Sequence, residues 1–268
     1  MVNRKNDYAF KRIFGHEDTK DILARFLTVV LDVQIEPGEL TLVHTEFSPE
    51  YVADKASVLD IQVRRSANHE KMNIEMQIAD DGDLARRVLF YWSKGYIEDL
   101  KEGGDYGTLP RMVSIIVVDF DVHEWKNKTK FHGAFRVMEP EEGKVFSDAL
   151  EIHVLELPKL RRQPVKKEWG ALECWCLYLD NAGGEIMENI AGKEPLIRRA
   201  RTVEEVFAKD EEERRLYELR EKGRRSFESA LNASERKVRR EVARSMLADG
   251  IPLERVLKIT SLTAKDLN

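Results

Sequence analysis

SVLDIQVRRSANHEKMNIEMQIA, residues 57–79, predicts two β-strands joined by a polar loop. Apolar and polar side chains alternate through 57–64 and again through 72–79, which is the period of a strand. Because successive strand residues point to opposite faces of a sheet, the apolar residues of both strands line one face. Their polar residues line the other face, and a hairpin brings the two polar rows together.

The polar face of this hairpin collects carboxylates and amides. Pairing the strands across the loop at 65–71 brings Asp60 nearly opposite Glu75. Gln62 and Gln77 fall on the same face. Two carboxylates this close repel each other, and a hard divalent cation relieves the repulsion. Water held by such an ion can attack a phosphodiester, so the face suits metal-assisted hydrolysis of phosphate esters.

Alternation alone also fits the solvent face of an ordinary antiparallel sheet, where polar residues recur by default. Two observations favour a functional site instead. The face carries carboxylates and amides, whereas exposed β-sheet surfaces more often carry Thr, Lys and Arg. In addition, the next helix should pack on this sheet, which would place part of the face in a cleft.

The segments around the hairpin predict an α/β order. Residues 7–31 predict a helix that Gly15 and the polar stretch after it can divide, and 40–47 predict a strand. Residues 83–101 predict a long amphipathic helix, and 111–120 predict a buried strand. The first 120 residues therefore run helix, three strands, helix, strand, with an antiparallel start and a crossover into the last strand.

The remainder of the chain is mixed and then increasingly helical. FRVMEP at 135–140 and ALEIHVLEL at 149–157 are strand candidates, and 164–181 predict a helix. Residues 201–248 are rich in Glu, Arg and Lys and predict long solvated helices. We therefore divide the chain into a core at 1–160, a charged helical region at 161–248 and a small helix-turn-helix-like tail at 249–268.

The charge pattern argues mildly against a protein that coats DNA. The net charge is −5, whereas proteins that bind DNA non-specifically are usually basic. Basic clusters at 159–167, 197–201 and 222–225 are interleaved with acidic segments, which favours solvated faces over phosphate contacts. The tail at 249–268 is too short for a complete DNA-binding module, which favours a small packing or dimerisation element.

Cysteine usage and hydropathy exclude several classes of protein. Cys174 and Cys176 are too few for a disulfide scaffold or a four-thiolate zinc site, and their apolar neighbours indicate packing in a reducing compartment. MVNRKNDYAF carries no signal pattern, and the apolar run at 113–118 is too short to span a membrane. The six histidines show no metal-ligand spacing. We therefore expect a cytoplasmic protein with no membrane partner.

Five segments, in order along the chain, resemble the recombination-promoting nuclease or transposase branch of the PD-(D/E)XK superfamily. The closing GIPLERVLKITSLTAKDL fits the same branch, so the resemblance covers nearly the whole chain. The five segments are DYAFKRIFG, KASVLDIQV, MNIEMQIA, RRVLFYWSKGYIEDLKEGGDYGTLPRMVSIIVVDF and HVLELPKL.

The resemblance implies a restriction-endonuclease-like α/β core of helix, three strands, helix and strand, followed by a helical C-terminal region. The acidic residue of the second strand falls on Asp60, and the (D/E)-x-K of the third strand falls on Glu75-Met76-Gln77. By this resemblance Asp60 and Glu75 hold Mg²⁺ or Mn²⁺, with the Met76 carbonyl as a further ligand. Gln77 completes the catalytic trio.

Gln77 departs from the superfamily pattern, although the resembling branch shares this glutamine. Glutamine orients groups by hydrogen bonds and supplies no positive charge, so another cation or a second metal ion would have to compensate. Lys55, just before the second strand, and Arg87, on the following helix, are candidates to contact DNA phosphate. Arg87 and Tyr91 match a recurrent R-x-x-x-Y of the family. The alternatives are a surface charge for Arg87 and, favoured, core packing for Tyr91.

Asp7 and Lys11 stand at i, i+4 on the first predicted helix. They either support the cleft or form an exposed ion pair worth roughly a few tenths of a kcal/mol. We favour the ion pair and keep both residues as candidate supporting residues.

The function that follows is a Mg²⁺- or Mn²⁺-dependent DNA endonuclease acting in recombination or on mobile DNA. DNA is the expected partner, and a homodimer is expected because each active site serves one strand. One alternative is an inactive nuclease fold that serves as a DNA-binding or assembly module. Another is a ribonuclease-H-like transposase built on Asp60, Asp119 and Glu173, which the strand order disfavours.

Overall fold

A computed structural model describes most of the 268-residue chain. Contacts divide the chain into two compact units, Met1–Tyr217 and Glu218–Asn268. The described residues are 2–44, 59–67, 69–80, 82–123 and 128–267.

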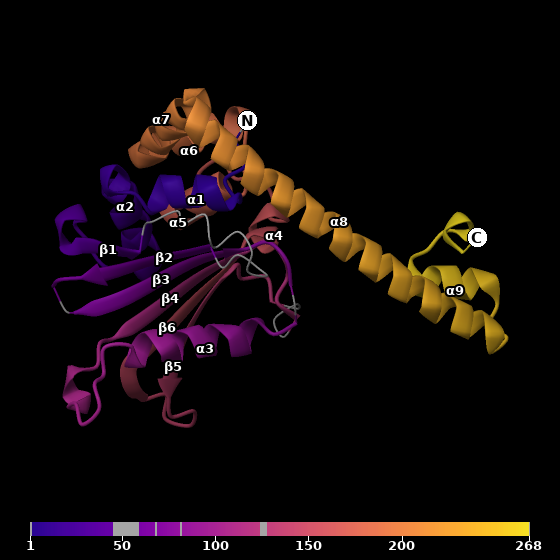
Figure 1. The fold of residues 1–268 in the computed structure, drawn as a ribbon, viewed down its shortest axis with the longest axis horizontal. Helices are drawn as coiled ribbons and strands as arrows, with labels where there is room; N and C mark the ends of the chain where they lie inside the picture. Colours follow the sequence, from indigo (N-terminus) through magenta and orange to yellow (C-terminus); the bar gives the residue numbers. More distant parts are fainter. Residues whose placement is uncertain (1, 45–58, 68, 81, 124–127, 268) are drawn as a thin grey trace. The chain divides into compact units, whose positions relative to one another are not determined.

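One mixed sheet organises the first unit (Figure 1). Among the described residues its strand order is β1-β2-β3-β4-β6-β5. The first three strands pair antiparallel, β3–β4 and β4–β6 pair parallel, and β5 lies antiparallel to β6. The bounds are Leu40–His44 for β1, Leu59–Arg65 for β2, Glu70–Gln77 for β3, Met112–Val118 for β4, His132–Met138 for β5 and Val145–Glu156 for β6.

The parallel pairing of β3 with β4 requires a crossover, and α3, Leu84–Ile97, supplies it. Every residue of β4 is buried, as expected for a central strand whose two faces are both covered. Leu84 and Val88 of α3 pack against Ile116 and Val118 of β4. This contact fixes α3 across the polar face of the β2–β3 hairpin.

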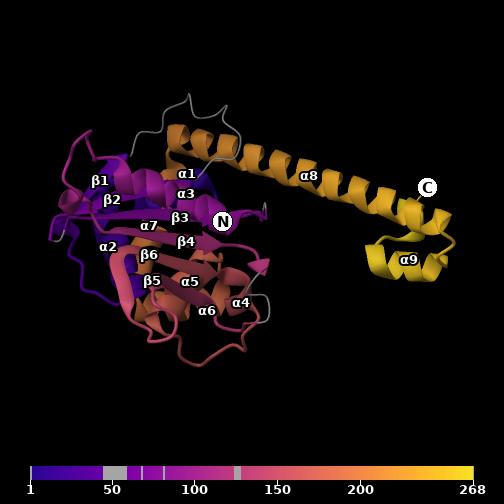
Figure 2. The same ribbon diagram turned by 90° about the horizontal axis from the view of Figure 1, so that it is seen from below.

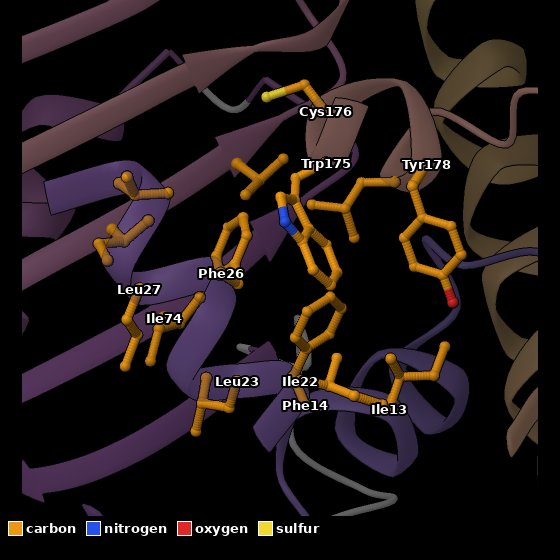
Figure 3. Close-up of a cluster of buried hydrophobic side chains, with 14 of the residues drawn as sticks. Ile13, Phe14, Ile22, Leu23, Phe26, Leu27, Ile74, Trp175, Cys176 and Tyr178 are labelled. Atoms are coloured by element: carbon orange, nitrogen blue, oxygen red, sulfur yellow. The ribbon is translucent and has the colours of Figure 1, made fainter. Parts of the chain in front are cut away.

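Helices from both ends of the first unit cover the other face of the sheet, and Figure 1 shows them on the side opposite α3. Their core is aromatic: the Trp175 ring lies 5.9 Å from that of Phe14 and 6.0 Å from that of Phe26 (Figure 3). These helices are α1 (Asp7–Phe14), α2 (Lys20–Leu31), α4 (Leu157–Arg161), α5 (Ala171–Leu179), α6 (Gly184–Lys193) and α7 (Pro195–Lys209).

The expected break at Gly15 is confirmed, because α1 ends at Phe14 and Gly15 caps it. A Cβ at Gly15 would lie 2.9 Å from the Lys11 carbonyl oxygen and 3.3 Å from Ile61 of β2. The absence of a side chain there lets α1 approach the sheet. Asn6 begins the helix, since its side-chain oxygen accepts from the backbone N–H groups of Tyr8 and Ala9.

Several predicted boundaries need correction. The helix expected over 164–181 begins only at Ala171, because Glu173 receives the Gly170 N–H and sets the first turn there. The helix expected over 83–101 ends at Ile97, where Lys71 of β3 binds the carboxylates of Glu98 and Asp99. The strand expected over 40–47 is seen as β1, and residues 45–47 lie outside the described residues.

The second unit contains most of α8 (Glu211–Ala248), then α9 (Leu253–Thr260) and the 3-10 turn Ala264–Asp266. Figures 1 and 2 both show α9 folded back beside the end of α8. Gly250, with φ +80°, ends α8 in the left-handed conformation that glycine adopts without steric cost. Ala243, Val256 and Leu262 form the small buried core.

A helix that spans a membrane must be both long and apolar. In the part of the chain that the structure describes, no helix combines the length and the apolar composition needed to cross a bilayer. The 38-residue α8 is long enough, but charged residues line it throughout.

Candidate functional site

The register of the β2–β3 hairpin places Asp60 directly opposite Glu75, as the alternation predicted. Gln62 is paired with Asn73 one step along the same face. Directly opposed residues in an antiparallel pair have Cβ atoms roughly 5 Å apart. The backbone therefore presents one acidic residue from each strand at a single point on the face below α3. For Asp60 the structure describes this backbone position alone.

Glu75 is the buried centre of the site, with 2% of its surface exposed. The Asn73 side-chain amide donates to Glu75 Oε1 over 2.7 Å, and the Gln77 amide donates to Oε2 over 3.2 Å. Both donors stand two residues away on β3, so all three side chains rise from the same face. Each carboxylate oxygen has two acceptor positions, so these bonds orient Glu75 without exhausting it.

Arg87 of α3 completes this row of hydrogen bonds. Its Nη2 donates to Gln77 Oε1, while the Gln77 amide donates to Glu75. The guanidinium reaches Gln77 because Leu84 and Val88, on the neighbouring turn of α3, are anchored to β4. A fixed positive charge thus stands one hydrogen bond behind Gln77, and the relay Arg87–Gln77–Glu75 joins α3 to β3.

The wall of the site on the β4 side is apolar. Glu75 pairs with Ile116, and Gln77 pairs with Val118. Ile116 and Val118 are buried, with 1% and 0% of their surface exposed. Charges beside such a wall interact more strongly than they do in water, because little solvent screens them.

The predicted supporting residues differ in their surroundings. Tyr91 is half-buried on α3, one turn after Arg87, and its ring packs edge-to-face on Phe90 at 5.4 Å. The Asp7–Lys11 ion pair forms at 3.2 Å, but it is not exposed as expected, since the side chains are 9% and 30% exposed. Lys55 lies outside the described residues.

Asp119 and Glu173, required by the transposase alternative, have other partners. Asp119 follows β4 and pairs with Lys5 at 2.7 Å and with Arg161 at 2.6 Å. Glu173 caps α5 and pairs with Lys166. Asp119 is the residue after Val118, whose side chain lies on the Gln77 side of the sheet. Strand alternation therefore turns Asp119 toward the opposite face, away from Glu75.

Asn73 shares the polar face of β3 with Glu75 and was not among the predicted site residues. The signal was present, because Asn73 stands two residues before Glu75 in the same alternating strand. Asparagine is uncharged and absent from the (D/E)-x-K pattern, so no motif singled it out. Its role is visible only in the hydrogen bond that it donates to Glu75.

The donor set fits a hard divalent cation. Mg²⁺ is held by one or two carboxylates and keeps several waters, and the hairpin register offers one acidic residue from each of two strands. Among the side chains that the structure describes, which do not include that of Asp60, no group of three or more His, Cys, Asp or Glu residues is placed to hold a metal ion.

The two cysteines behave as packing residues. Both are free and fully buried in the aromatic core beside Trp175. Burial raises the pKa of Cys174 to about 11 and raises that of Cys176 further. A thiol with so high a pKa stays protonated near neutral pH and is a poor metal ligand or nucleophile.

Comparison with known proteins identifies two matching families. A family described as "PD-(D/E)XK nuclease family transposase" matches residues 4–234. A second, described as "Rpn/YhgA-like nuclease family, C-terminal HTH domain", matches residues 236–268. No curated protein and no solved structure matches the chain. The second match begins inside α8 and so includes residues upstream of the tail predicted at 249–268. The helix that completes the helix-turn-helix lies upstream of residue 249.

Proposed function

The chain belongs to the PD-(D/E)XK nuclease family transposases, and from this we propose that it is a divalent-metal-dependent DNA endonuclease of recombination or mobile DNA. Its family and its C-terminal helix-turn-helix indicate a nuclease- or transposase-related role and a DNA partner. The observation that carries the finer proposal is the relay Arg87–Gln77–Glu75 beside the Asp60–Glu75 register pair.

Asp60 and Glu75 would hold the ion, Mg²⁺ or Mn²⁺, with the Met76 carbonyl as a further ligand. Such an ion supplies an activated water and stabilises the charge that develops on the phosphate. Asn73 and Gln77 hold the two oxygens of Glu75, so its carboxylate is already oriented before substrate arrives. Pre-orientation of this kind lowers the reorganisation needed at the moment of reaction.

Arg87 would supply the positive charge that Gln77 lacks in the lysine position. Glutamine carries no charge, but Gln77 accepts from the Arg87 guanidinium, which cannot be deprotonated in proteins. The hydrogen bond polarises the Gln77 amide and turns its NH₂ group toward Glu75. The positive charge that the family motif places on the strand is therefore supplied from α3.

The test is cleavage of supercoiled plasmid with Mg²⁺ or Mn²⁺. Wild type should nick and linearise the plasmid. Asp60→Asn and Glu75→Gln should each lose activity, because each substitution removes one carboxylate while the side chain keeps nearly the same size. Asp119→Asn serves as the matched control and should cut at close to the wild-type rate. Loss of cutting in Asp119→Asn, with cutting retained in Glu75→Gln, would favour the ribonuclease-H-like alternative.

The second candidate is a nuclease fold that binds DNA without cutting it. The observation in its favour is that both oxygens of Glu75 already receive amide hydrogen bonds. Wild type that binds the plasmid but leaves it intact with both ions would support this candidate. Light scattering of the full chain tests the accompanying homodimer, and cell fractionation tests the cytoplasmic location.

A further inference from the structure

The last turns of α8 carry four cations that the candidate site does not use. Arg236, Arg240 and Arg244 recur at every fourth position, and Lys237 stands beside them; we call these four residues the α8 stripe. The α-helical rise puts successive arginines about 6 Å apart along one face. All four side chains are exposed. A single helix face therefore presents a row of positive charge to solvent.

Three other arginines of α8 form ion pairs with glutamates of the same helix. Arg224 and Arg225 both pair with Glu221, and Arg239 pairs with Glu235 at 3.5 Å. Within the described ranges no ion pair engages any member of the stripe. Four like charges on adjacent turns repel one another. A bound polyanion would relieve that repulsion.

The surface beside the stripe is hollowed. Ser229, Asn232 and Ala233 are short residues, and with Arg225, the stripe and one acidic residue, Glu241, they line a hollow along α8. A hollow of this kind suits an extended anionic ligand that lies along the helix.

The stripe belongs to the folded helix-turn-helix unit. Residues 236–268 form the match to the C-terminal HTH domain, and Ala243, inside the stripe segment, is buried with Val256 of α9. Hydrogen bonds from Thr263 lower the pKa of Asp266 in the closing 3-10 turn, and the positive charges of Arg240 and Arg236 lower it further. The row of charge is thus held in a fixed place relative to α9.

We propose that the α8 stripe is the surface through which the C-terminal unit holds the sugar–phosphate backbone of duplex DNA. That DNA is the partner rests on the proposed function, and the stripe adds the surface that binds it. Guanidinium groups match phosphate oxygens in bidentate geometry. In helix-turn-helix proteins the helix before the recognition helix crosses the backbone. Contacts to phosphate position the protein and carry no sequence information.

Salt dependence of binding tests this surface directly. Full-length protein is titrated against a short duplex of arbitrary sequence in EDTA, so that no cleavage occurs. The compared variant carries Arg236→Gln, Lys237→Gln, Arg240→Gln and Arg244→Gln. Each phosphate contact contributes a slope of about −0.9 to the dependence of log K on log salt. Between about 50 and about 200 mM salt, wild type should therefore lose roughly 150-fold more affinity than the variant.

Two matched variants guard against a trivial result. Arg239→Gln removes one charge from the same turns of α8 but breaks an existing pair with Glu235, and it should keep the wild-type slope. Arginine-to-lysine changes at 236, 240 and 244 keep the charge and should keep most of the slope. Thermal melting of each variant checks that the unit is folded.

A wild-type slope in the four-residue variant overturns the inference. So does tighter wild-type binding to vesicles rich in anionic lipid, or to single-stranded RNA, than to duplex DNA. The Glu75→Gln variant separates this test from the test of cleavage, since it should bind with the wild-type slope. The wild-type protein could fail to cut DNA while the four-residue variant shows a smaller salt slope of DNA binding. That result would support DNA binding by the stripe and contradict the proposed nuclease activity.

Discussion

The side-chain amide of Gln77 donates to Glu75 over 3.2 Å. Because the other end of the same amide accepts from Arg87, removing that guanidinium should release Gln77 and weaken the orientation of Glu75. We predict that Arg87→Gln lowers the rate of plasmid cleavage by about 10²–10³-fold, the usual cost of losing one pre-organised donor. Single-turnover cleavage at saturating Mg²⁺ measures the effect.

Arg86→Gln is the control for that experiment, since Arg86 is the neighbouring arginine and its side chain is 89% exposed. It should change the rate by less than about twofold, as expected for a surface charge. The double variant Arg87→Gln with Gln77→Lys moves the cation from α3 to β3. It should recover cleavage relative to Arg87→Gln alone, and no recovery would mean that Arg87 acts through structure and not through charge.

Asn73 should matter for stability as well as for activity. Asn73→Leu leaves one oxygen of the buried Glu75 without its 2.7 Å donor, so we expect a loss of about 1–3 kcal/mol in the free energy of unfolding. Urea denaturation measures it. In the Glu75→Gln background the same change should cost less, because no buried carboxylate remains. Equal costs in both backgrounds would show that the two side chains are not coupled.

Binding of the ion should be visible without catalysis. A ligand at about 100-fold its Kd stabilises the folded state by about 2.7 kcal/mol, which for a unit of this size raises Tm by roughly 5–10 °C. We predict such a rise with Mn²⁺ for wild type and none for Glu75→Gln. Glu173→Gln, which alters a carboxylate at the start of α5, should respond like wild type.

Side-chain alternation was sufficient to predict the pairing of Asp60 with Glu75, because the period of a strand and the length of the loop leave little freedom in register. The contact between Arg87 and Gln77 could not be predicted from the sequence. It depends on how α3 sits on Ile116 and Val118, and that position is set by packing between segments distant in the chain.

The errors at element ends have a similar origin. Helical periodicity continued past Ile97, but Lys71 of β3 captures the following carboxylates, a tertiary contact that no local pattern reports. The helix-turn-helix was underestimated because its first helix is the end of α8, whose charged sequence resembles any solvated helix. In both places the deciding partner lies outside the segment itself.

His132 and His153 supply the final prediction, which concerns acid stability. His132 Nε2 lies 2.8 Å from His153 Nδ1, and His153 Nε2 lies 3.0 Å from Glu151. Burial, followed by the nearby His153 and Lys130, lowers the pKa of His132 to about 4. Burial also lowers the pKa of His153, against the opposing effect of Glu151.

The lowered pKa of His132 determines the direction in which the free energy of unfolding changes with pH. His132 is neutral in the folded protein above about pH 4, whereas in the unfolded chain it takes up a proton below about pH 6.5. The unfolded state therefore binds more protons between about pH 6.5 and pH 4, and the free energy of unfolding should fall as pH falls through that window. Arg111 and Arg136, which pair with Glu151 on the same face, add positive charge that further opposes protonation.

Replacing His132 with Gln should flatten this acid limb while leaving stability above pH 7 nearly unchanged, since glutamine keeps a hydrogen-bonding group beside His153 and does not titrate. Urea denaturation at a series of pH values measures the slope. The exposed His123 provides the control, and His123→Gln should keep the wild-type slope. An unchanged slope in His132→Gln would show that His132 titrates in the folded protein as it does in the unfolded chain.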